Sequence, residues 1–231
     1  IKHPDDAEFG DLQFHQSAYK TTRKWADVPT LDATRDGEKV WVRARVHGIR
    51  DKKKMVFVVL RRAYHSLQVV VDEATGLSPE FLRFVAKIPF ESVVDVYGVV
   101  KKANVKSCSQ SDAEIQAIKF FVVSASVPQL PFKLDDAMNP DPKEAEKKKA
   151  EEEGREITVA LKTRLDNRWV DVRTHANHAI FRIQSYVCQF FRQYFLDMDF
   201  VEIHSPKITP GVSEGGSEVF KFKYFGRESC L

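Results

Sequence analysis

The sequence predicts a mainly β first half and an α+β second half, joined by a hinge. Three observations carry this prediction: hydrophobic residues alternate with polar ones in five runs between residues 39 and 124, a proline-rich and then charged stretch follows, and a long amphipathic run comes after it. Alternation is typical of strands with one buried face, and three- and four-residue spacing is typical of helices. The expected segments are an N-terminal arm at 1–36, a β domain at 37–127, a hinge at 128–160 and the start of a second domain at 161–231.

Composition limits the classes of protein that need to be considered. The chain has 231 residues, of which 43% are hydrophobic and 30% are charged, as expected for a globular protein long enough for two modest domains. The formal net charge of +3 is too small to predict a diffuse polyanion binder. Contacts with a nucleic acid would therefore have to come from a local basic face.

Cysteine and histidine spacing predicts neither a disulfide framework nor a metal site. Cys108, Cys188 and Cys230 are far apart in the sequence, which favours a reduced, intracellular protein. The histidines of the second half lack the spacing of a zinc site, so no metal-binding residue is predicted. No apolar run approaches the roughly 20 residues that span a bilayer, and we expect a cytoplasmic protein without a membrane partner.

Five strands and one helix can be placed in the β domain. Ser78, Pro79 and Glu80 supply the N-cap, the first position and the first-turn acid of the helix. The expected elements are strands at 39–49, 55–61, 66–71, 92–100 and 115–124, with a helix at 81–86 between the third and fourth strands. This order is that of an OB-fold, a five-stranded, partly open barrel whose second and third strands commonly bind oligonucleotides.

The expected binding surface of the barrel is basic and contains an aromatic ring. Arg43, Arg45, Arg50 and the hairpin Lys52–Lys54 could attract a phosphate backbone, and Phe57 offers a ring on which a base could stack. A second interpretation of Phe57 stays open, because in the run MVFVVL it could equally be an ordinary core residue. A basic cluster at residues 20–24 of the arm could likewise contact phosphate or simply be solvated.

The hinge and the segment after it have different patterns. Four prolines between residues 128 and 142 forbid regular structure there, and the charged run Lys143–Glu153 predicts a short solvated helix. A longer helix, at about Asn177–Leu196, carries one wide apolar stripe. That stripe could belong to a hydrophobic core, to a subunit interface, or to both.

The stretch 200–220, FVEIHSPKITPGVSEGGSEVF, predicts a strand, a break at Pro206, a second strand and a glycine-containing acidic loop. This layout resembles motif 1 of the class II aminoacyl-tRNA synthetases. The Ser-Glu-Gly-Gly loop is similar to the substrate-covering loop of aspartyl-tRNA synthetases of the eukaryotic and archaeal type. The upstream segment TRLDNRWVDVRT, from Thr163, resembles the beginning of the catalytic domain in the same family.

The resemblance implies that the barrel binds an anticodon. Arg50, Phe57, Gln68 and Glu91 fall where this family carries an arginine, a stacking phenylalanine, a glutamine and a glutamate that contact the G-U-C anticodon of tRNA(Asp). A carboxylate such as that of Glu91 can accept hydrogen bonds from both N1 and N2 of guanine, and Phe57 would stack on the central uracil. The second interpretation of Glu91 is a surface carboxylate at the start of a strand.

For the second half, the resemblance implies a homodimeric aspartate–tRNA ligase that uses ATP and Mg²⁺. The residues that would bind L-aspartate are Ser213, Glu214, Gly215 and Gly216. Phe200 and Pro206 would lie at the dimer interface. The antiparallel-sheet catalytic domain would only begin in this chain, so no catalytic residue is expected within it and the 231 residues alone are expected to be inactive. The alternative is a non-catalytic RNA-binding OB-fold protein with a dimerisation segment.

Overall fold

The computed structural model describes residues 7–12, 23–139, 148, 152, 158–210 and 219–231. By its internal contacts the chain divides into two compact units, residues 1–178 and 179–231. The first unit holds the β domain and the segment up to the first turn of the long helix. The second holds the rest of that helix and the stretch after it.

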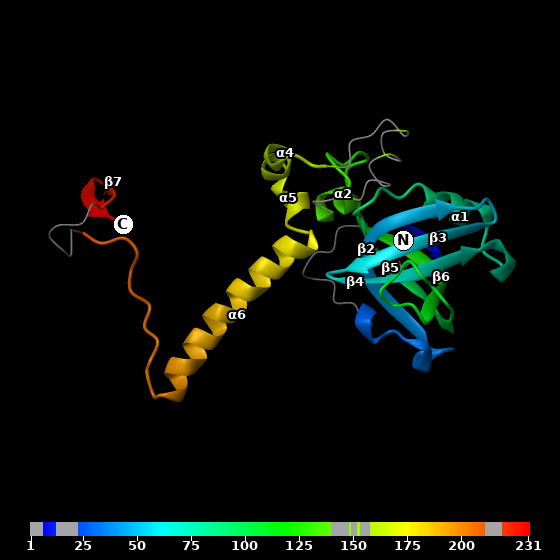
Figure 1. Ribbon diagram of the computed structural model, residues 1–231, viewed down its shortest axis with the longest axis horizontal. Helices are drawn as coiled ribbons and strands as arrows, with labels where there is room; N and C mark the ends of the chain where they lie inside the picture. The colour runs from blue at the N-terminus through cyan, green and yellow to red at the C-terminus, as the bar shows by residue number, and fades with distance from the viewer. Residues whose placement is uncertain (1–6, 13–22, 140–147, 149–151, 153–157, 211–218) are drawn as a thin grey trace. The chain divides into compact units, whose positions relative to one another are not determined.

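The β domain is a closed barrel of five strands (Figure 1). The strands are β2 (Lys39–Asp51), β3 (Met55–Arg62), β4 (His65–Asp72), β5 (Val93–Lys102) and β6 (Ala113–Ser124). β2, β3 and β4 are successive antiparallel neighbours, and β5 pairs with the other edge of β2. β6 closes the barrel because it pairs antiparallel with β5 and parallel with β4. The predicted strands and the OB-fold are confirmed, with small differences at the strand ends.

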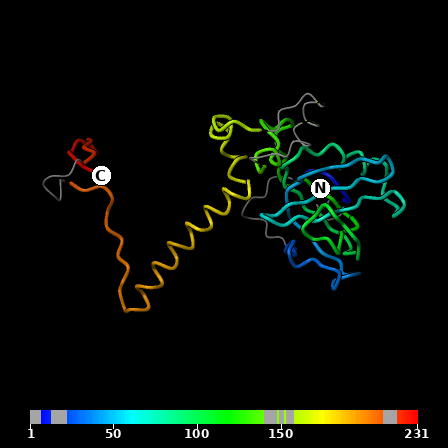
Figure 2. Tube along the Cα trace, viewed as in Figure 1, coloured from blue at the N-terminus to red at the C-terminus, as the bar shows by residue number. Residues whose placement is uncertain are grey.

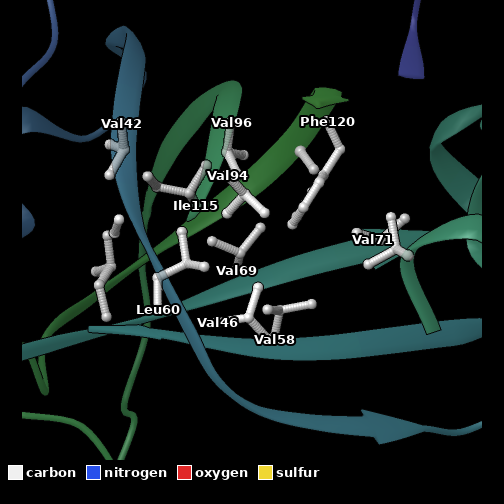
Figure 3. Close-up of a cluster of buried hydrophobic side chains, with 14 of the residues drawn as sticks. Val42, Val46, Val58, Leu60, Val69, Val71, Val94, Val96, Ile115 and Phe120 are labelled. Carbon is white, nitrogen blue, oxygen red and sulfur yellow. The ribbon is translucent and has the colours of Figure 1, made fainter. Parts of the chain in front are cut away.

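Alternate residues of the strands fill the interior of the barrel. Figure 3 shows valine, leucine, isoleucine and phenylalanine side chains from β2 to β6 pointing toward one another. Val56 and Val58 are 1% and 0% exposed, whereas Phe57 between them is only partly buried. Because successive side chains of a strand point to opposite faces, Phe57 faces outward. The interpretation of Phe57 as an ordinary core residue is therefore wrong.

A short helix covers one part of the barrel core, as the sequence predicts. α1 (Pro79–Ala86) follows the 3-10 helix η4 (Glu73–Thr75). Its N-cap is Ser78, whose hydroxyl accepts a hydrogen bond from the backbone N–H of Phe81 at 3.2 Å. This cap satisfies one of the donors that a helix leaves unpaired at its start. Phe81, Leu82 and Val85 then pack into the core.

The described residues of the N-terminal arm contribute to the β domain. β1 (Phe9–Asp11) pairs in parallel with β6, and the ring centroid of Phe9 lies 5.0 Å from that of Phe81. Two 3-10 helices, η2 (Val28–Thr30) and η3 (Ala33–Arg35), lie further along the described part of the arm. Val28 and Leu31 are fully buried in the barrel core.

Short helices follow the barrel and precede a long one. The short helices are α2 (Leu134–Met138), α4 (Leu161–Asp166) and α5 (Arg168–Asp171), and the long helix is α6 (His175–Asp197). Of the predicted hinge helix only Lys148 and Glu152 are described, and both are helical. The buried carboxylate of Asp171 explains the arginine-rich segment that begins this part: it accepts hydrogen bonds from Arg164 at 2.6 Å, from Asn177 at 3.0 Å and from Arg168.

α6 continues without interruption into the second unit (yellow to orange in Figure 2) and confirms the predicted helix. Its apolar stripe is open in the described chain. The side chains that are 61% to 66% exposed are Ile183, Val187, Phe190, Phe191 and Tyr194. None of the helices in the described ranges is long and apolar enough to cross a membrane.

The strand predicted at the start of the 200–220 stretch is not observed. Residues 201–206 have no regular secondary structure, and Val201 and Ile203 are each 83% exposed. A strand needs a neighbour that pairs with its backbone groups, and between residues 201 and 210 the described pairing is limited to an isolated bridge from Thr209 to Cys230. The hairpin that follows consists of β7 (Lys221–Tyr224) and β8 (Arg227–Cys230).

Candidate nucleic-acid interface

One face of the barrel exterior collects an aromatic ring and polar side chains from four strands. Arg50 of β2 pairs with Phe57 of β3, which in turn pairs with Val70 of β4. Two residues back along β4, Gln68 pairs with Glu114 of β6. Residues that are paired across strands, or two apart on one strand, share a face. Arg50, Phe57, Gln68 and Glu114 therefore share one surface, named the outer face below.

Glu114 is a member of the outer face that the sequence did not single out. The side-chain amide of Gln68 donates a hydrogen bond to its carboxylate at 2.7 Å, and both side chains are only partly buried. The alternation in the run AEIQAI does predict that Glu114 points outward. The parallel pairing of β4 with β6, which brings together residues 46 apart in the sequence, has no local signal.

Glu91 has surroundings that neither interpretation of it predicted. Its side chain is buried, at 3% exposure, and it accepts hydrogen bonds from Arg61 at 2.6 Å and from Arg173 at 2.8 Å. Burial alone would raise the pKa of Glu91, but the charge and hydrogen bond of Arg61, together with those of Arg173, hold that pKa below its ordinary value. Glu91 is thus not a surface carboxylate, and with both oxygens engaged it is poorly suited to read a base.

Part of the predicted basic surface is neutralised within the fold. Arg43 donates hydrogen bonds to the buried Asp95 at 2.6 and 2.8 Å, which raise the pKa of its guanidinium, and it lies 4.3 Å from the ring centre of Trp25. Arg23, from the basic cluster of the arm, lies 3.7 Å from Asp95, while residue 20 of that cluster is outside the described residues. These contacts fasten the arm to the barrel. Arg50, in contrast, is exposed.

Of the binding and interface residues predicted in the second half, some lie outside the described residues and the others are exposed. Ser213, Glu214, Gly215 and Gly216, the predicted L-aspartate contacts, lie outside the described residues. Phe200 is 58% exposed and packs edge-to-face on Phe195, with ring centroids 5.2 Å apart, and Pro206 is also exposed. Phe200 lines an apolar groove of about 440 Å³ together with residues of α6.

Comparison with known families assigns the two halves of the chain separately. Residues 40–123 match the family described as OB-fold nucleic acid binding domain, which coincides with β2 to β6. Residues 160–227 match the family described as tRNA synthetases class II (D, K and N), which runs from the start of α4 to β8. The second match disfavours the alternative of a barrel joined only to a dimerisation segment.

Comparison with individual proteins extends the likeness over nearly the whole chain. The cytoplasmic aspartate–tRNA ligase of Homo sapiens is 44% identical over 225 residues, which cover 96% of this chain and 44% of that protein. The corresponding protein of Caenorhabditis elegans is 40% identical over the same share of this chain and 42% of its own length. The crystal structure of a putative aspartyl-tRNA synthetase from Leishmania major Friedlin matches 98% of this chain and 42% of that one, with a TM-score of 0.81 and 38% identity.

The chain therefore spans less than half the length of these relatives. Within that span it has the barrel, the arginine-rich segment and the helix that the resemblance to motif 1 implies. Over the part that it covers, this chain belongs to the aspartyl-tRNA synthetase family of class II.

Proposed function

We propose that the chain supplies the anticodon-binding part and the beginning of the catalytic part of an aspartate–tRNA ligase acting on tRNA(Asp). The observation that carries the anticodon role is the outer face, where a partly exposed ring lies beside a hydrogen-bonded amide–carboxylate pair on an OB-fold. Aromatic rings stack bases, and side-chain amides and carboxylates recognise base edges in single-stranded RNA.

On this surface the carboxylate that reads guanine is Glu114, in place of Glu91. A guanine presents N1 and N2 donors together, and a carboxylate accepts both. Glu114 is partly exposed and its present hydrogen-bond donor is the neutral amide of Gln68, which a base can replace at small cost. Phe57 stacks on the central uracil, and Arg50 meets the phosphate backbone or a remaining base edge.

The first test is the affinity of the chain for a stem-loop RNA with a G-U-C anticodon. Phe57→Ala should weaken binding by about 1 to 3 kcal/mol, the range found for one base on one aromatic ring. Phe90→Ala removes another exposed ring, 45% exposed and not on the outer face, and should leave the affinity unchanged. Equal affinities for wild type and Phe57→Ala in a gel-shift titration would rule out the stacking role.

The catalytic part of the proposal concerns L-aspartate, ATP and Mg²⁺. The family resemblance assigns aspartate contacts to residues 213–216, where the carboxylate of Glu214 could bind the substrate ammonium group. The resemblance also implies ATP as a substrate and Mg²⁺ as a cofactor. Within the described ranges no three His, Cys, Asp or Glu side chains are grouped so as to hold a metal ion, so we assign no step of the reaction to residues of this chain.

The proposal includes a homodimer in the cytoplasm. A twofold arrangement would cover the open apolar stripe of α6 with the same patch of a second copy, and Phe200 and Pro206 would lie at its edge. The apolar groove of about 440 Å³ beside Phe200 is a site for side chains of that copy. The matching relatives are named as cytoplasmic proteins, which supports the same location for this one.

A further inference from the structure

A pocket rich in arginine lies in the first unit and takes no part in the contacts proposed above. It is a cavity of about 300 Å³, at the lower end of the sizes of small-molecule sites. Its charged lining consists of Arg43, Arg45, Arg61, Arg62 and Arg173. This cavity is named the arginine pocket below. Its other lining residues, among them Ala44, Ala63 and Val172, are mostly apolar and so lower the local dielectric.

The arginine pocket carries more positive charge than its own carboxylates neutralise. Within the described chain its arginines contact three carboxylates, those of Asp27, Asp95 and Glu91. Asp27 pairs with Arg62 and Asp95 pairs with Arg43, whereas Glu91 is shared between Arg61 and Arg173. Arg45 donates a hydrogen bond to the backbone oxygen of Glu91 at 3.0 Å, and no carboxylate of the described residues forms an ion pair with it. Five guanidinium groups thus face three carboxylates, which leaves two positive charges uncompensated.

Buried nitrogen atoms without hydrogen-bond partners give an independent sign of a missing ligand. Arg61 is 6% exposed, and its Nε has no hydrogen-bond partner among the described residues. The Nδ1 of His178, which also lines the arginine pocket, has none either within those residues. Buried polar atoms without partners are rare in folded proteins. Burial, together with the charge of Arg173, lowers the pKa of Arg45, so a bound anion would relieve an existing repulsion.

We propose that the arginine pocket binds a phosphate group. Guanidinium forks match the oxygens of a phosphate in pairs, and such charge-assisted hydrogen bonds are strong where water is partly excluded. Two sources have this chemistry, a phosphate of an RNA backbone and free inorganic phosphate or pyrophosphate. The RNA source is within reach of the proposed interface, because Arg61 is on β3 in the same alternation as Phe57. Occupation of the pocket by an RNA phosphate rests on the proposed function, whereas binding of free phosphate or pyrophosphate does not.

The free-phosphate arm of the test uses the whole chain without RNA. Isothermal titration with inorganic pyrophosphate, at an ionic strength held constant with chloride, should show one saturable site. Arg45→Gln should weaken that binding by at least about tenfold, since one hydrogen bond between charged groups is lost, and Arg45→Lys should restore part of it. Arg83→Gln removes an exposed arginine of α1 outside the pocket and should have no effect. Circular dichroism checks that each variant is folded.

The RNA arm measures how the affinity for the G-U-C stem-loop depends on salt. If an RNA phosphate occupies the pocket, Arg45→Gln should reduce the slope of log K against log salt by about one, and Arg83→Gln should not. Weaker pyrophosphate binding with an unchanged slope would assign the pocket to free phosphate. A variant Arg45→Gln that matches Arg83→Gln in both measurements overturns the proposal. A Phe57→Ala variant with wild-type RNA affinity would instead contradict the proposed function and leave the pyrophosphate result standing.

Discussion

At the scale of single residues, the carboxylates of Glu91 and Glu114 have different surroundings: Glu91 forms buried ion pairs, and Glu114 forms a partly buried hydrogen bond. Glu91 has a positive φ of 67° and lies buried between Arg61 and Arg173, so its charge holds the barrel to the segment after α5. Glu114 is partly exposed and shares a hydrogen bond with Gln68. A buried ion pair of this kind is costly to break, whereas we propose that the partly buried pair of Gln68 and Glu114 exchanges one partner for a base.

Loss of Glu91 should therefore destabilise the first unit. Glu91→Ala leaves Arg61 buried without its counter-ion and should lower the free energy of unfolding by about 3 to 5 kcal/mol. Urea unfolding at neutral pH measures this difference. The exposed pair Glu80 and Arg83 gives a matched control, and Glu80→Gln should change the free energy of unfolding by less than about 1 kcal/mol.

The same ion pairs predict a pH dependence. The pKa of Glu91 in the folded protein is held below its ordinary value of 4.5, so the stabilisation is fully present above that value and is lost as the pH falls through the folded pKa. The difference in stability between wild type and Glu91→Gln should shrink on acidification below about pH 4.5. A difference that stays constant well below pH 4.5, through the acid range in which carboxylates are protonated, would contradict the burial of Glu91 between two arginines.

Local sequence predicts some of these residues and not others. Alternation predicts the strands that carry Arg50 and Phe57, but the family resemblance, and not the local pattern, singled out these two residues as anticodon contacts. The surroundings of Glu91 depend on Arg173, 82 residues further along the chain, and those of Glu114 depend on a parallel strand pairing. No window of a few residues contains either fact, so the local sequence does not distinguish the buried Glu91 from the partly exposed Glu114.

At the scale of elements, barrel closure depends on the close crossing of β5 and β6. At Gly98 an added Cβ would overlap the backbone oxygen of Gln116 and the side chain of Ile115. The β5–β6 register shifts at the same point, between Tyr97 and Gly98. Glycine is therefore required there by the approach of two backbones.

Gly98→Ala should lower the free energy of unfolding by about 1 to 3 kcal/mol, the usual cost of overpacking a well-filled site. Gly48→Ala is the matched control on β2, because an added Cβ there meets only the Cβ of Val59 at 4.0 Å. Chemical denaturation of both variants measures the contrast. Equal stability of the two variants would mean that β5 and β6 do not cross as closely as described.

The apolar stripe of α6 predicts the assembly of the natural full-length protein. Phe191 is 66% exposed in this chain, and Phe191→Asp should convert a dimer at micromolar concentration into a monomer because it buries a charge at the twofold interface. Gln189→Asp adds the same charge on the opposite side of the helix and should leave the dimer intact. Sedimentation velocity distinguishes these outcomes, and a monomeric wild type would exclude the proposed interface.

Elements with strong periodicity were predictable, and one short element was not. The strands of the barrel and α6 follow directly from alternation and from three- and four-residue spacing. The strand expected at Val201 and Ile203 has the same alternation but no pairing partner among the described residues. Alternation specifies which side of an extended segment is apolar. The segment forms a β-strand only when a neighbouring strand pairs with its backbone groups.

At the scale of the whole molecule, each of the two units has its own proposed partner. The first unit has a hydrophobic core, the outer face that we propose binds RNA, and the arginine pocket. The second unit exposes the apolar stripe of α6, which the proposed dimer would cover. Recognition of tRNA(Asp) would belong to the first unit, and assembly and the beginning of the aspartate site to the second.

The central claim is that Glu114 on the outer face reads the guanine of a G-U-C anticodon. Inosine lacks the N2 amine of guanine, so replacing that guanine with inosine removes one donor to the carboxylate. Wild-type chain should bind the inosine stem-loop more weakly by about 1.5 to 3 kcal/mol, the value of a hydrogen bond to a charged group, and Glu114→Ala should bind both stem-loops equally. An undiminished preference for guanine in Glu114→Ala, or equal binding of both stem-loops by the wild type, would contradict the claim.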